Sequence, residues 1–459
     1  MDTIKVILEY IQIFFLIYLI GYSTFLFLSV IVGSNVFFED IKKKKLKNEI
    51  KQDHYVPVSI IVPAYNEEVT VIDTVKSLLN LNYIIYEIIV VDDGSKDDTS
   101  KNLIEYFSLK EVKRPIRKII ECNEVVAIYE SSVERKVPIT LITKENGGKA
   151  DALNMGINVS KYPYFVCIDA DSLLQYNALE KISVPIIEDE KVVAVGSMIQ
   201  ISNDVEFKNG KVSKYRMPKK MLPSMQVLEY ERSFLASRLL LDSFNGNLIV
   251  SGAFGLFKKS IVIAAGGYER GSMGEDMELI VKLHVFCKSN KMPYSIKYAH
   301  EAICWTQAPE KFRDLMKQRR RWHIGLFQSM TKHKKLFFSF SYIYFLLYEL
   351  ASPLIEVIGI LAVILASYLN LLNTRFMIIF LIVYGIFGAV LTIISFLTRN
   401  YLNDIKLRAR DILKALILCI PENIFLRFIL AWVRIIAILT YRGKKTKWGR
   451  IERKKTLYS

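Results

Sequence analysis

The feature that most limits how this chain can fold is a stretch without any charged residue, Ile11–Phe38. About 20 consecutive apolar residues are enough for a helix to cross the hydrocarbon core of a bilayer. A secretory signal peptide has a shorter apolar core, followed by a small-residue cleavage site. We therefore expect a retained transmembrane helix within residues 1–40. The basic run at Lys42–Lys47 follows it, and because basic residues mark the cytosolic side, the chain beyond should lie in the cytosol.

Apolar segments return after residue 336 and predict further membrane helices. Pro353–Leu372 and Phe376–Leu397 have the length of two spans joined by a short outer loop. The stretch Ile412–Tyr441 is interrupted by Pro421 and by charged residues, which favours a helical hairpin or an interfacial helix. Either arrangement would keep the basic tail, residues 442–459, in the cytosol, whereas a single clean span would not.

Two acidic residues lie near the first of these spans. Glu349 is well placed for the membrane interface. Glu356 falls within the span, where a carboxylate usually faces other protein groups or a water-filled path. Interfacial placement and a pathway role both stay open for Glu356.

The charge balance narrows the classes of partner. Lys and Arg total 62 against 46 Asp and Glu, a net charge of +16. Such a surplus suits nucleic acid, anionic lipid or phosphorylated substrates. Because the basic residues gather at the membrane flanks and the tail, without interleaved aromatic residues, we expect no nucleic acid as a partner. The five cysteines form no CxxC pair and the five histidines no HxxH or HExxH motif, so the sequence gives no sign of a zinc site.

Two apolar strands with acidic ends lie in the middle of the chain. Val58–Glu68 and Tyr86–Ser100 each begin with a β-branched run and end in polar residues, and a segment with helical spacing separates them. This order predicts a parallel α/β sheet, in which ligands bind beyond the carboxyl ends of the strands. Neither GxGxxG nor GxxxxGK[ST] occurs, so the dinucleotide fingerprint and the P-loop are excluded. The polar residues at the strand ends are Asn66, Glu67, Asp92 and Asp93.

A third apolar strand, YFVCI, leads into Asp169-Ala170-Asp171. Alternation along an extended strand end would point both carboxylates to the same side. Two convergent carboxylates repel each other unless a cation lies between them, and Mg²⁺ or Mn²⁺ with phosphate oxygens is the usual solution. A solvated turn is the alternative interpretation of these aspartates.

Two glycine-containing loops precede predicted helices. In KENGGKADALN, Gly147 and Gly148 permit close backbone approach, and Lys149 opens a helix near whose N-terminus phosphate binds well. A plain loop-to-helix junction is the alternative. In GSMGEDMEL, Glu275 and Asp276 begin a helix, where acids also complement the helix dipole. The functional interpretation is a carboxylate at a cleft that accepts a proton.

The stretch KQRRRWHIG precedes the second apolar region. Membrane topology accounts for the basic residues Arg319 and Arg320, which would meet anionic headgroups at the inner membrane face. It does not explain Gln318, Arg321 and Trp322, which fall at i, i+3 and i+4 and so share one helix face. A guanidinium suits a diphosphate, and an indole offers a flat apolar surface with a donor at its edge. We therefore expect Arg319→Ala to matter much less than Trp322→Ala.

Two segments are harder to assign. Gln226, Glu229 and Tyr230 share one face of a predicted helix, for which a surface helix with salt bridges and a contact with an acceptor are the alternatives. The insert at Leu103–Leu141 contains Pro, Cys and mixed charge, and no role follows from its sequence.

In their order and spacing, VPAYNEE with VVDDGS, then DAD, GED and QRRRW resemble the processive family 2 glycosyltransferases. These are the membrane synthases of cellulose, chitin, hyaluronan and poly-N-acetylglucosamine. The likeness covers about Val58–Trp322, and the membrane segments on both sides agree with it. KENGGKADALN and SGAFGLFKK, at Ser251–Lys259, are also similar to bacterial exopolysaccharide members. The chain departs from better-known synthases in having one N-terminal span where some have two, and we expect no C-terminal β-domain for a cyclic dinucleotide.

The resemblance implies an α/β domain of the GT-A type, a nucleotide-diphospho-sugar transferase, that uses a UDP-sugar and a divalent metal, Mg²⁺ or Mn²⁺. Asp276 would be the general base. Asp171 would be the direct metal ligand, with Asp169 engaging both nucleotide and metal. The nucleotide-sugar would contact Asn66, Glu67, Asp92 or Asp93, Lys149 and Asp169, and the acceptor or diphosphate would contact Glu275, Gln318, Arg321 and Trp322.

The resemblance also implies a function. We expect a membrane-embedded inverting enzyme that polymerises a UDP-sugar, with UDP-GlcNAc favoured, into a β-linked exopolysaccharide and extrudes it. The alternative is a non-processive enzyme that glycosylates a lipid. A degenerate binding subunit is disfavoured because all the expected acids are present.

Location, partners and organisation follow from the same resemblance. The protein should lie in the plasma membrane, with a cytosolic catalytic domain. Its partners would be the donor, the growing polysaccharide, membrane lipids and an accessory membrane subunit. The expected parts are a transmembrane helix (1–40), a catalytic domain (50–300), interfacial helices (301–350), C-terminal transmembrane or interfacial helices (351–441) and a basic tail (442–459).

Overall fold

The computed structural model describes residues 2–47, 55–132, 136–208, 210–333, 339–402 and 406–441. The basic tail expected at 442–459 lies outside the described residues, as do residues 48–54 at the expected start of the catalytic domain. The strands are β1 (Val58–Ala64), β2 (Tyr86–Asp92), β3 (Lys110–Glu111), β4 (Val125–Glu130), β5 (Ile139–Lys144), β6 (Tyr164–Ile168), β7 (Leu173–Leu174), β8 (Val192–Ile201), β9 (Glu206–Lys208), β10 (Lys211–Lys214), β11 (Phe254–Lys258) and β12 (Ser295–Thr306).

The helices of the described residues include three π-helical turns, labelled η. Those of the sheet domain and its border are α2 (Val71–Leu79), α3 (Thr99–Phe107), α4 (Lys149–Val159), α5 (Ala178–Glu188), α6 (Met221–Arg232), η1 (Ser233–Ser237), α7 (Arg238–Ser243), α8 (Lys259–Ala264), α9 (Glu275–Ser289) and α10 (Phe312–Lys332). The remaining helices are α1 (Asp2–Lys47), α11 (Phe340–Tyr344), η3 (Phe345–Leu350), α12 (Ser352–Tyr368), α13 (Thr374–Leu402), α14 (Ala409–Pro421), η4 (Glu422–Leu426) and α15 (Arg427–Leu439).

The large sheet is mixed, with strand order β3-β4-β5-β2-β1-β6-β11-β8-β12-β7. The expected parallel pairing holds for the centre, where β5, β2, β1 and β6 all run in one direction. It fails on both sides, because β4 is antiparallel to β5 and β11 is antiparallel to β6 and β8. The central strands are apolar throughout because helices cover both of their faces. Every residue of β2, for example, is buried.

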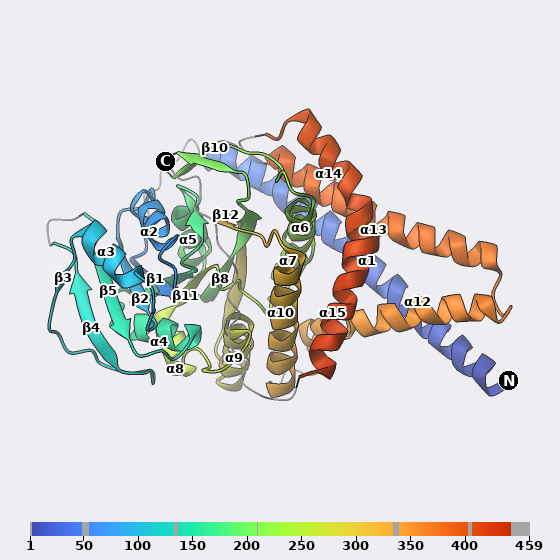
Figure 1. Ribbon diagram of the computed structural model, residues 1–459, viewed down its shortest axis with the longest axis horizontal. Coiled ribbons are helices and arrows are strands. Elements are labelled where there is room, and N and C mark those ends of the chain that lie inside the picture. Colours follow the sequence, from blue (N-terminus) through green and yellow to red (C-terminus); the bar gives the residue numbers. More distant parts are fainter. Residues whose placement is uncertain are drawn as a thin grey trace.

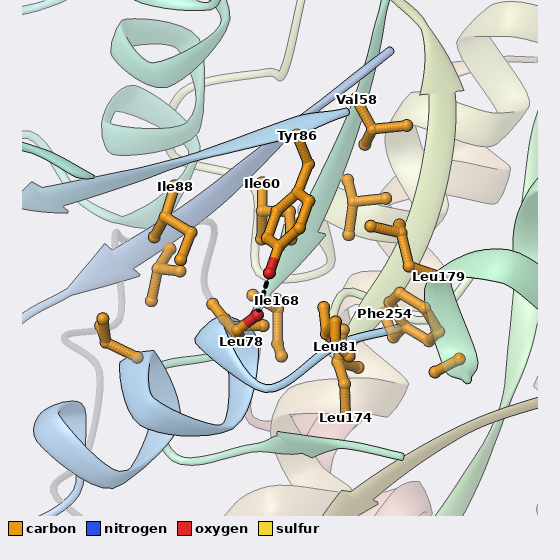
Figure 2. Close-up of a cluster of buried hydrophobic side chains, with 14 of the residues drawn as sticks. Val58, Ile60, Leu78, Leu81, Tyr86, Ile88, Ile168, Leu174, Leu179 and Phe254 are labelled. Carbon is orange, nitrogen blue, oxygen red and sulfur yellow. Dashed lines mark hydrogen bonds between the residues drawn. The ribbon is translucent and has the colours of Figure 1, made fainter. Parts of the chain in front are cut away.

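The core on one face of the sheet joins β1, β2 and β6 to α2 and α5 (Figure 2). Within it the Tyr86 hydroxyl donates a hydrogen bond to the Leu78 carbonyl at 2.8 Å, so the one polar atom of that ring is satisfied. On the other face α4 lies so close to β1 that a Cβ on Gly156 would come within 2.3 Å of the Ile61 side chain. This close contact sets how near the second half of α4 lies to the middle of β1.

Three described helical segments are long and apolar enough to cross a membrane: Ile4–Val36, Thr374–Tyr401 and Ala409–Leu439. A fourth candidate is the pair Phe340–Leu350 and Ser352–Tyr368, which is bent by 52°. In Figure 1, α12 and α13 extend away from the sheet domain, while α15 runs beside α10 and α14 lies against α6 and α13. The described part of the chain therefore has three or four helices of spanning length around one side of the sheet domain.

The hairpin alternative for Ile412–Tyr441 is wrong. The helix that begins at Ala409 continues through η4 to Leu439. Pro421 cannot donate an amide hydrogen bond, and the wider π turn that follows it accommodates this loss without reversing the chain. The interfacial alternative stays a prediction, because this continuous helix is also long and apolar enough to cross a membrane.

Candidate active site

The predicted site residues meet at the carboxyl edge of the central strands. β1 and β2 end side by side, with Ala64 opposite Asp92 in the parallel register. Asn66, at a φ of 56°, donates its amide to Ser95 Oγ at 2.9 Å, and its Oδ1 accepts from the Lys96 amide at 2.8 Å. These contacts join the loops after β1 and β2 into one wall.

Glu67 reinforces the same wall. Its backbone amide donates to Thr99 Oγ1 at 2.9 Å, and its Oε2 accepts from the Thr70 hydroxyl at 2.8 Å. The first contact reaches the start of α3 and the second reaches the residue before α2. The predicted residues of both loops are thus brought together, as the sequence indicated.

Asp92 and Asp93 are both buried but have different surroundings. Asp92 accepts from the Ser95 amide at 2.8 Å and from the Ser100 hydroxyl. Asp93 accepts from the amides of Gly147 and Gly148, at 3.0 and 2.7 Å.

Asp93 also forms a buried ion pair with Lys144, with 2.6 Å between Nζ and Oδ1. Burial raises the pKa of Asp93, although Lys144 and the Gly147 amide act in the opposite direction. Asp93 therefore holds the loop before α4 in place. The close backbone approach that Gly147 and Gly148 permit is thus used by this carboxylate.

Lys149, the first residue of α4, lies between two acids. Its Nζ is 2.6 Å from Asp169 Oδ1 and 3.1 Å from Glu275 Oε1. Burial alone would lower the pKa of Lys149, but the attraction of Asp169 and Glu275 outweighs it and the pKa is raised. Lys149 is therefore a charged group at every physiological pH, placed where strand β6, helix α4 and helix α9 converge.

The DAD segment is a turn rather than the end of a strand. β6 stops at Ile168, and the Ser172 amide donates to the Asp169 carbonyl at 3.0 Å. The expectation of strand alternation at Asp169 and Asp171 is therefore wrong, and the turn interpretation describes the backbone. Thr74 fixes the turn by donating its hydroxyl to the Ala170 carbonyl at 2.8 Å. This leaves Asp169 about a third exposed, while Asp171 is buried.

The donor set of this turn fits a hard divalent cation. No group of three or more Asp, Glu, His or Cys side chains within the described ranges could hold a metal by itself. Mg²⁺ and ions like it need only one or two carboxylates when water and substrate phosphates complete the shell. Asp169 is already paired with the ammonium of Lys149, so a divalent cation would have to share this carboxylate with that ammonium.

Asp276 lies at the start of α9, beside Lys149. Its Oδ2 accepts from the Gly252 amide at 3.0 Å and its Oδ1 from the Met277 amide at 2.8 Å. Burial, and then the negative charge of Glu275, raise the pKa of Asp276. A carboxylate with a raised pKa is a better proton acceptor than an exposed one. The simple helix-start role accounts for the Met277 contact but not for the link to Gly252.

Gly252 is a site residue that the sequence reasoning missed. A Cβ there would lie 3.1 Å from Lys149 Nζ and 3.5 Å from Asp276 Oδ2. It belongs to the SGAFG segment, whose only signal in the sequence was a family likeness. Glycine is needed because backbone, lysine and carboxylate approach one another closely.

The α10 helix meets the GED turn through two glycines. A Cβ on Gly325 would come within 2.7 Å of the Gly274 backbone, and a Cβ on Gly274 within 3.0 Å of Gly325. Gln328, one turn further along, accepts from the Met273 amide at 2.9 Å. This contact holds the helix that bears the QRRRW motif against the start of α9.

We predict that Gly325→Ala will lower transfer activity by about tenfold or more, because the added methyl must push α10 away from the GED turn. Overpacking of this kind costs about 1–3 kcal/mol. Gly385→Ala is the matched control, since its Cβ would meet only the Ile424 side chain, at 3.3 Å. Initial rates and melting temperatures of both variants would be compared, and equal rates would contradict the prediction.

The expectation that Arg319 faces the bilayer is wrong. Arg319 is only 1% exposed, and its Nη2 lies 2.6 Å from Glu229 Oε2. Its guanidinium also stacks over the Trp322 ring, 4.2 Å from the centroid. Arg320 is exposed as expected and donates to the Thr440 hydroxyl at 3.0 Å. Arg319 and Trp322 share a face at i, i+3, and helix α6 covers it.

The other predicted residues of the motif are partly buried. Gln318 has a buried Oε1 that accepts no hydrogen bond from the residues described, and Arg321 is half-buried. Trp322 is 43% exposed, and its ring lies 6.4 Å from that of Tyr230. The indole thus keeps an open surface next to a second aromatic ring.

Helix α6 is not a surface helix, so that alternative is also wrong. Gln226 is fully buried, and its Nε2 donates to the Pro309 carbonyl at 2.9 Å. Glu229 forms the expected salt bridge, but with the buried Arg319. Helices α10, α13 and α14 surround α6, and contacts so distant in sequence could not be read from helical spacing.

Comparison with known proteins places the chain in a family. The family model "Glycosyl transferase family 2" matches residues 59–263, and "Glycosyl transferase family group 2" matches residues 164–398. The poly-beta-1,6-N-acetyl-D-glucosamine synthase of Staphylococcus aureus (strain COL) is 30% identical over 314 residues, which cover 67% of this chain. The chain thus spans 64% of the length of that relative, slightly less than two thirds.

Two further proteins extend the comparison. The synthase of the same name from Staphylococcus epidermidis is 30% identical over 331 residues, which cover 70% of this chain and 69% of the relative. A solved structure of a mannosyltransferase from Pyrobaculum calidifontis, in complex with GDP-Man and Mn²⁺, aligns with a TM-score of 0.49 and 18% identity over 87% of this chain and 99% of that one. With its GT-A-like mixed sheet and its apolar helices of spanning length, this chain belongs to the family 2 glycosyltransferases.

Proposed function

We propose that this protein is a membrane-embedded inverting glycosyltransferase that polymerises UDP-GlcNAc into a β-linked polysaccharide and extrudes it. The observation that carries the proposal is the convergence of Lys149, Asp169, Glu275 and Asp276 at the carboxyl edge of the sheet. The choice of UDP-GlcNAc rests on the 30% identity to the two staphylococcal synthases.

In this proposal the chain's own residues divide the work of binding. The loops that contain Asn66, Glu67, Asp92 and Asp93 would hold the nucleoside, because their contacts already form one wall. Lys149 would oppose the negative charge of the diphosphate. A divalent ion bound by Asp171 and Asp169 would stabilise the charge that develops on the departing diphosphate.

Asp276 would perform the proton transfer. Its carboxylate would take the proton from an acceptor hydroxyl while that oxygen attacks the anomeric carbon of the donor. The bond from this carbon to the diphosphate oxygen would break on the opposite face, so that UDP leaves and the configuration inverts. The proton would remain on Asp276 until solvent removes it. Glu275, by pairing with Lys149, would keep the ammonium next to this carboxylate.

Trp322 would hold the acceptor. Its half-exposed indole beside Tyr230 offers a flat apolar surface for a sugar ring. Gln318 and Arg321 lie on the same helix and would contact the acceptor or the diphosphate. Because Gly325 packs α10 against the start of α9, this surface is held close to Asp276.

A polar cavity among the apolar helices supports extrusion. It has a volume of about 100 Å³ and lies among α1, α6, η1, η3, α12, η4 and α15. Glu356 lines it, which agrees with a pathway role for this residue, and accepts from Arg427 Nη2 at 2.5 Å. Charged residues at membrane depth normally face such a path or one another. We propose that the polymer leaves through this cavity once it widens.

The same features support the proposed location. The sheet domain would lie in the cytosol and the apolar helices in the plasma membrane. Exposed apolar side chains on α1, α12 and α13 would contact lipids or an accessory membrane subunit.

The test is a product analysis with protein purified into lipid vesicles. Radiolabelled UDP-GlcNAc, UDP-Glc and UDP-GlcA would be supplied separately, with Mg²⁺ or Mn²⁺. We expect long labelled polymer from UDP-GlcNAc, which would be digested by a glycosidase specific for β-linked GlcNAc. If the label entered only lipid-sized products, a glycolipid-forming enzyme would replace the synthase. Labelled polymer from another donor would change the sugar but not the reaction.

A further inference from the structure

The proposed function leaves the insert at Leu103–Leu141 without a role. The structure shows that β4 adds an antiparallel strand next to β5, and that β3 pairs with β4 at the edge of the sheet. The segment that precedes β4, residues 119–124, contacts α4. We call this segment the strap. It lies between the loop before α4 and the loop before α9. These two loops lead into Lys149 and Asp276, the two groups of the proposed reaction.

The strap is hydrogen-bonded to side chains of α4 and to the backbone of the loop before it. Asn158 Oδ1 accepts from the amides of Ile119 and Ile120, at 3.0 and 2.9 Å, and its Nδ2 donates to the Ile120 carbonyl at 2.7 Å. Asn123 donates its Nδ2 to the Asn146 carbonyl at 3.0 Å. The strap is therefore tied to the loop that leads into Lys149.

A row of alternating charges connects this loop to the strap. Lys144 Nζ lies 2.6 Å from Asp93 and 2.7 Å from Asp151. All three side chains are nearly inaccessible to solvent. The Asn123 amide donates to both carboxylate oxygens of Asp151, at 3.1 and 3.2 Å.

The row ends at Arg270, in the loop before α9. Its Nε lies 3.0 Å from Asp151 Oδ2, and its Nη2 donates to Asn123 Oδ1 at 2.5 Å. Arg270 also pairs with the exposed Glu121 of the strap, at 3.2 Å. The row therefore extends from the ends of β2 and β5 to the loop before α9, where Arg270 lies six residues before Asp276.

We propose that Lys144, Asp151 and Arg270 are positioning residues, which use the strap to hold the donor-binding loop and the loop before Asp276 in one arrangement. The proposal rests on the proposed function, in that Lys149 binds the donor and Asp276 is the base. Asp93 fixes the Gly147–Gly148 backbone only while Lys144 is itself fixed by Asp151. Loss of Arg270 removes the ion pair at Asp151 Oδ2. Because Asp151 and Lys149 both belong to α4, the resulting shift of α4 also moves Lys149.

The buried charges of this row are better explained by the positions in which they hold the two loops than by a contribution to the stability of the fold. Buried ion pairs often contribute no more to stability than apolar residues of the same size. Arg270 is 38% exposed, and partly exposed pairs contribute little. Replacing it should therefore change the two loops more than the fold.

The test compares Arg270→Gln with Arg114→Gln. Arg114 lies before the strap in the same insert and forms an ion pair of similar exposure with Glu130, at 2.9 Å, away from both loops. We expect Arg270→Gln to raise the Kd for UDP and the KM for UDP-GlcNAc by about fivefold or more, with a melting temperature close to that of the wild type. Arg114→Gln should change neither constant, and Arg270→Lys should recover part of the loss.

The outcomes separate this proposal from the proposed function. Unchanged Kd and KM in Arg270→Gln, or an equal rise in Arg114→Gln, would overturn the positioning role. Calorimetry with UDP needs no turnover, so a wild-type protein that binds UDP but forms no GlcNAc product would contradict only the proposed function. If Arg270→Gln fails to fold, Asn123→Ala provides the same test, because it removes the Arg270 acceptor and the Asn146 contact.

Discussion

Replacing Asp276 by asparagine is expected to abolish sugar transfer while UDP still binds. The amide keeps the size of the carboxylate and still accepts from the Gly252 amide, but it cannot take a proton from the acceptor. Loss of a general base typically lowers a rate by about 10²–10⁴-fold. Initial rates with labelled UDP-GlcNAc and calorimetric UDP titrations would measure the two properties separately.

Dependence on pH gives a second check on the same residue. Burial and Glu275 raise the pKa of Asp276, so protonation of the base begins at a higher pH than for an ordinary aspartate. Because only the deprotonated form accepts a proton, kcat/KM should fall as the pH is lowered through this raised pKa. Glu269→Gln, an exposed acid in the loop before α9, is the control and should retain the wild-type profile. Full activity in Asp276→Asn would remove Asp276 as the base.

Arg319→Ala is expected to inactivate the protein as severely as Trp322→Ala, whereas Arg320→Ala should have little effect. The sequence analysis instead expected Arg319→Ala to matter much less than Trp322→Ala. Removing one partner of a buried ion pair costs about 3–5 kcal/mol, and Glu229, which is mostly buried, would keep only the more distant Arg434, 4.0 Å away, as a counter-charge. The loss also removes the cation that supports the Trp322 ring. Rates and melting temperatures of the three variants would be compared in the same lipid.

A double variant separates folding from function at this site. Glu229→Gln combined with Arg319→Met removes both charges, so it should recover much of the stability that Arg319→Ala loses. It should not recover polymer formation if Arg319 also positions Trp322. If Arg319→Ala behaved like Arg320→Ala, the run of arginines would return to a purely topological role.

The sequence predicted the central strands well because strands buried on both faces of a parallel sheet are apolar along their whole length. β1, β2 and β6 are continuous apolar runs, and their polar ends necessarily meet at one edge. The antiparallel direction of β11 could not be inferred, because an apolar run gives no information on the direction in which the strand runs in the sheet. The DAD turn was only the alternative interpretation, because the apolar run gave no sign that the strand ends at Ile168, directly before the motif.

The errors around α10 have a different cause. Helical spacing shows which residues share a face, but not which face a distant segment will cover. Arg319 is covered by α6, about 90 residues earlier in the chain. The approach of Gly274 to Gly325 likewise depends on the whole path between them. Such contacts follow from tertiary structure and leave no local pattern.

The seam between the sheet domain and the apolar helices limits how this protein can be divided. Arg232 at the end of α6 donates to both oxygens of Glu422 in η4, at 2.7 and 2.9 Å, and to the Thr392 hydroxyl of α13. A fragment that stopped after α10 would leave this arginine with neither of those partners and expose the side of α6 that α13 and α14 cover. The two halves are therefore not modules that can be exchanged between relatives. Recombination, or a truncated soluble form for inhibitor screening, would have to keep residues from both sides of this seam together.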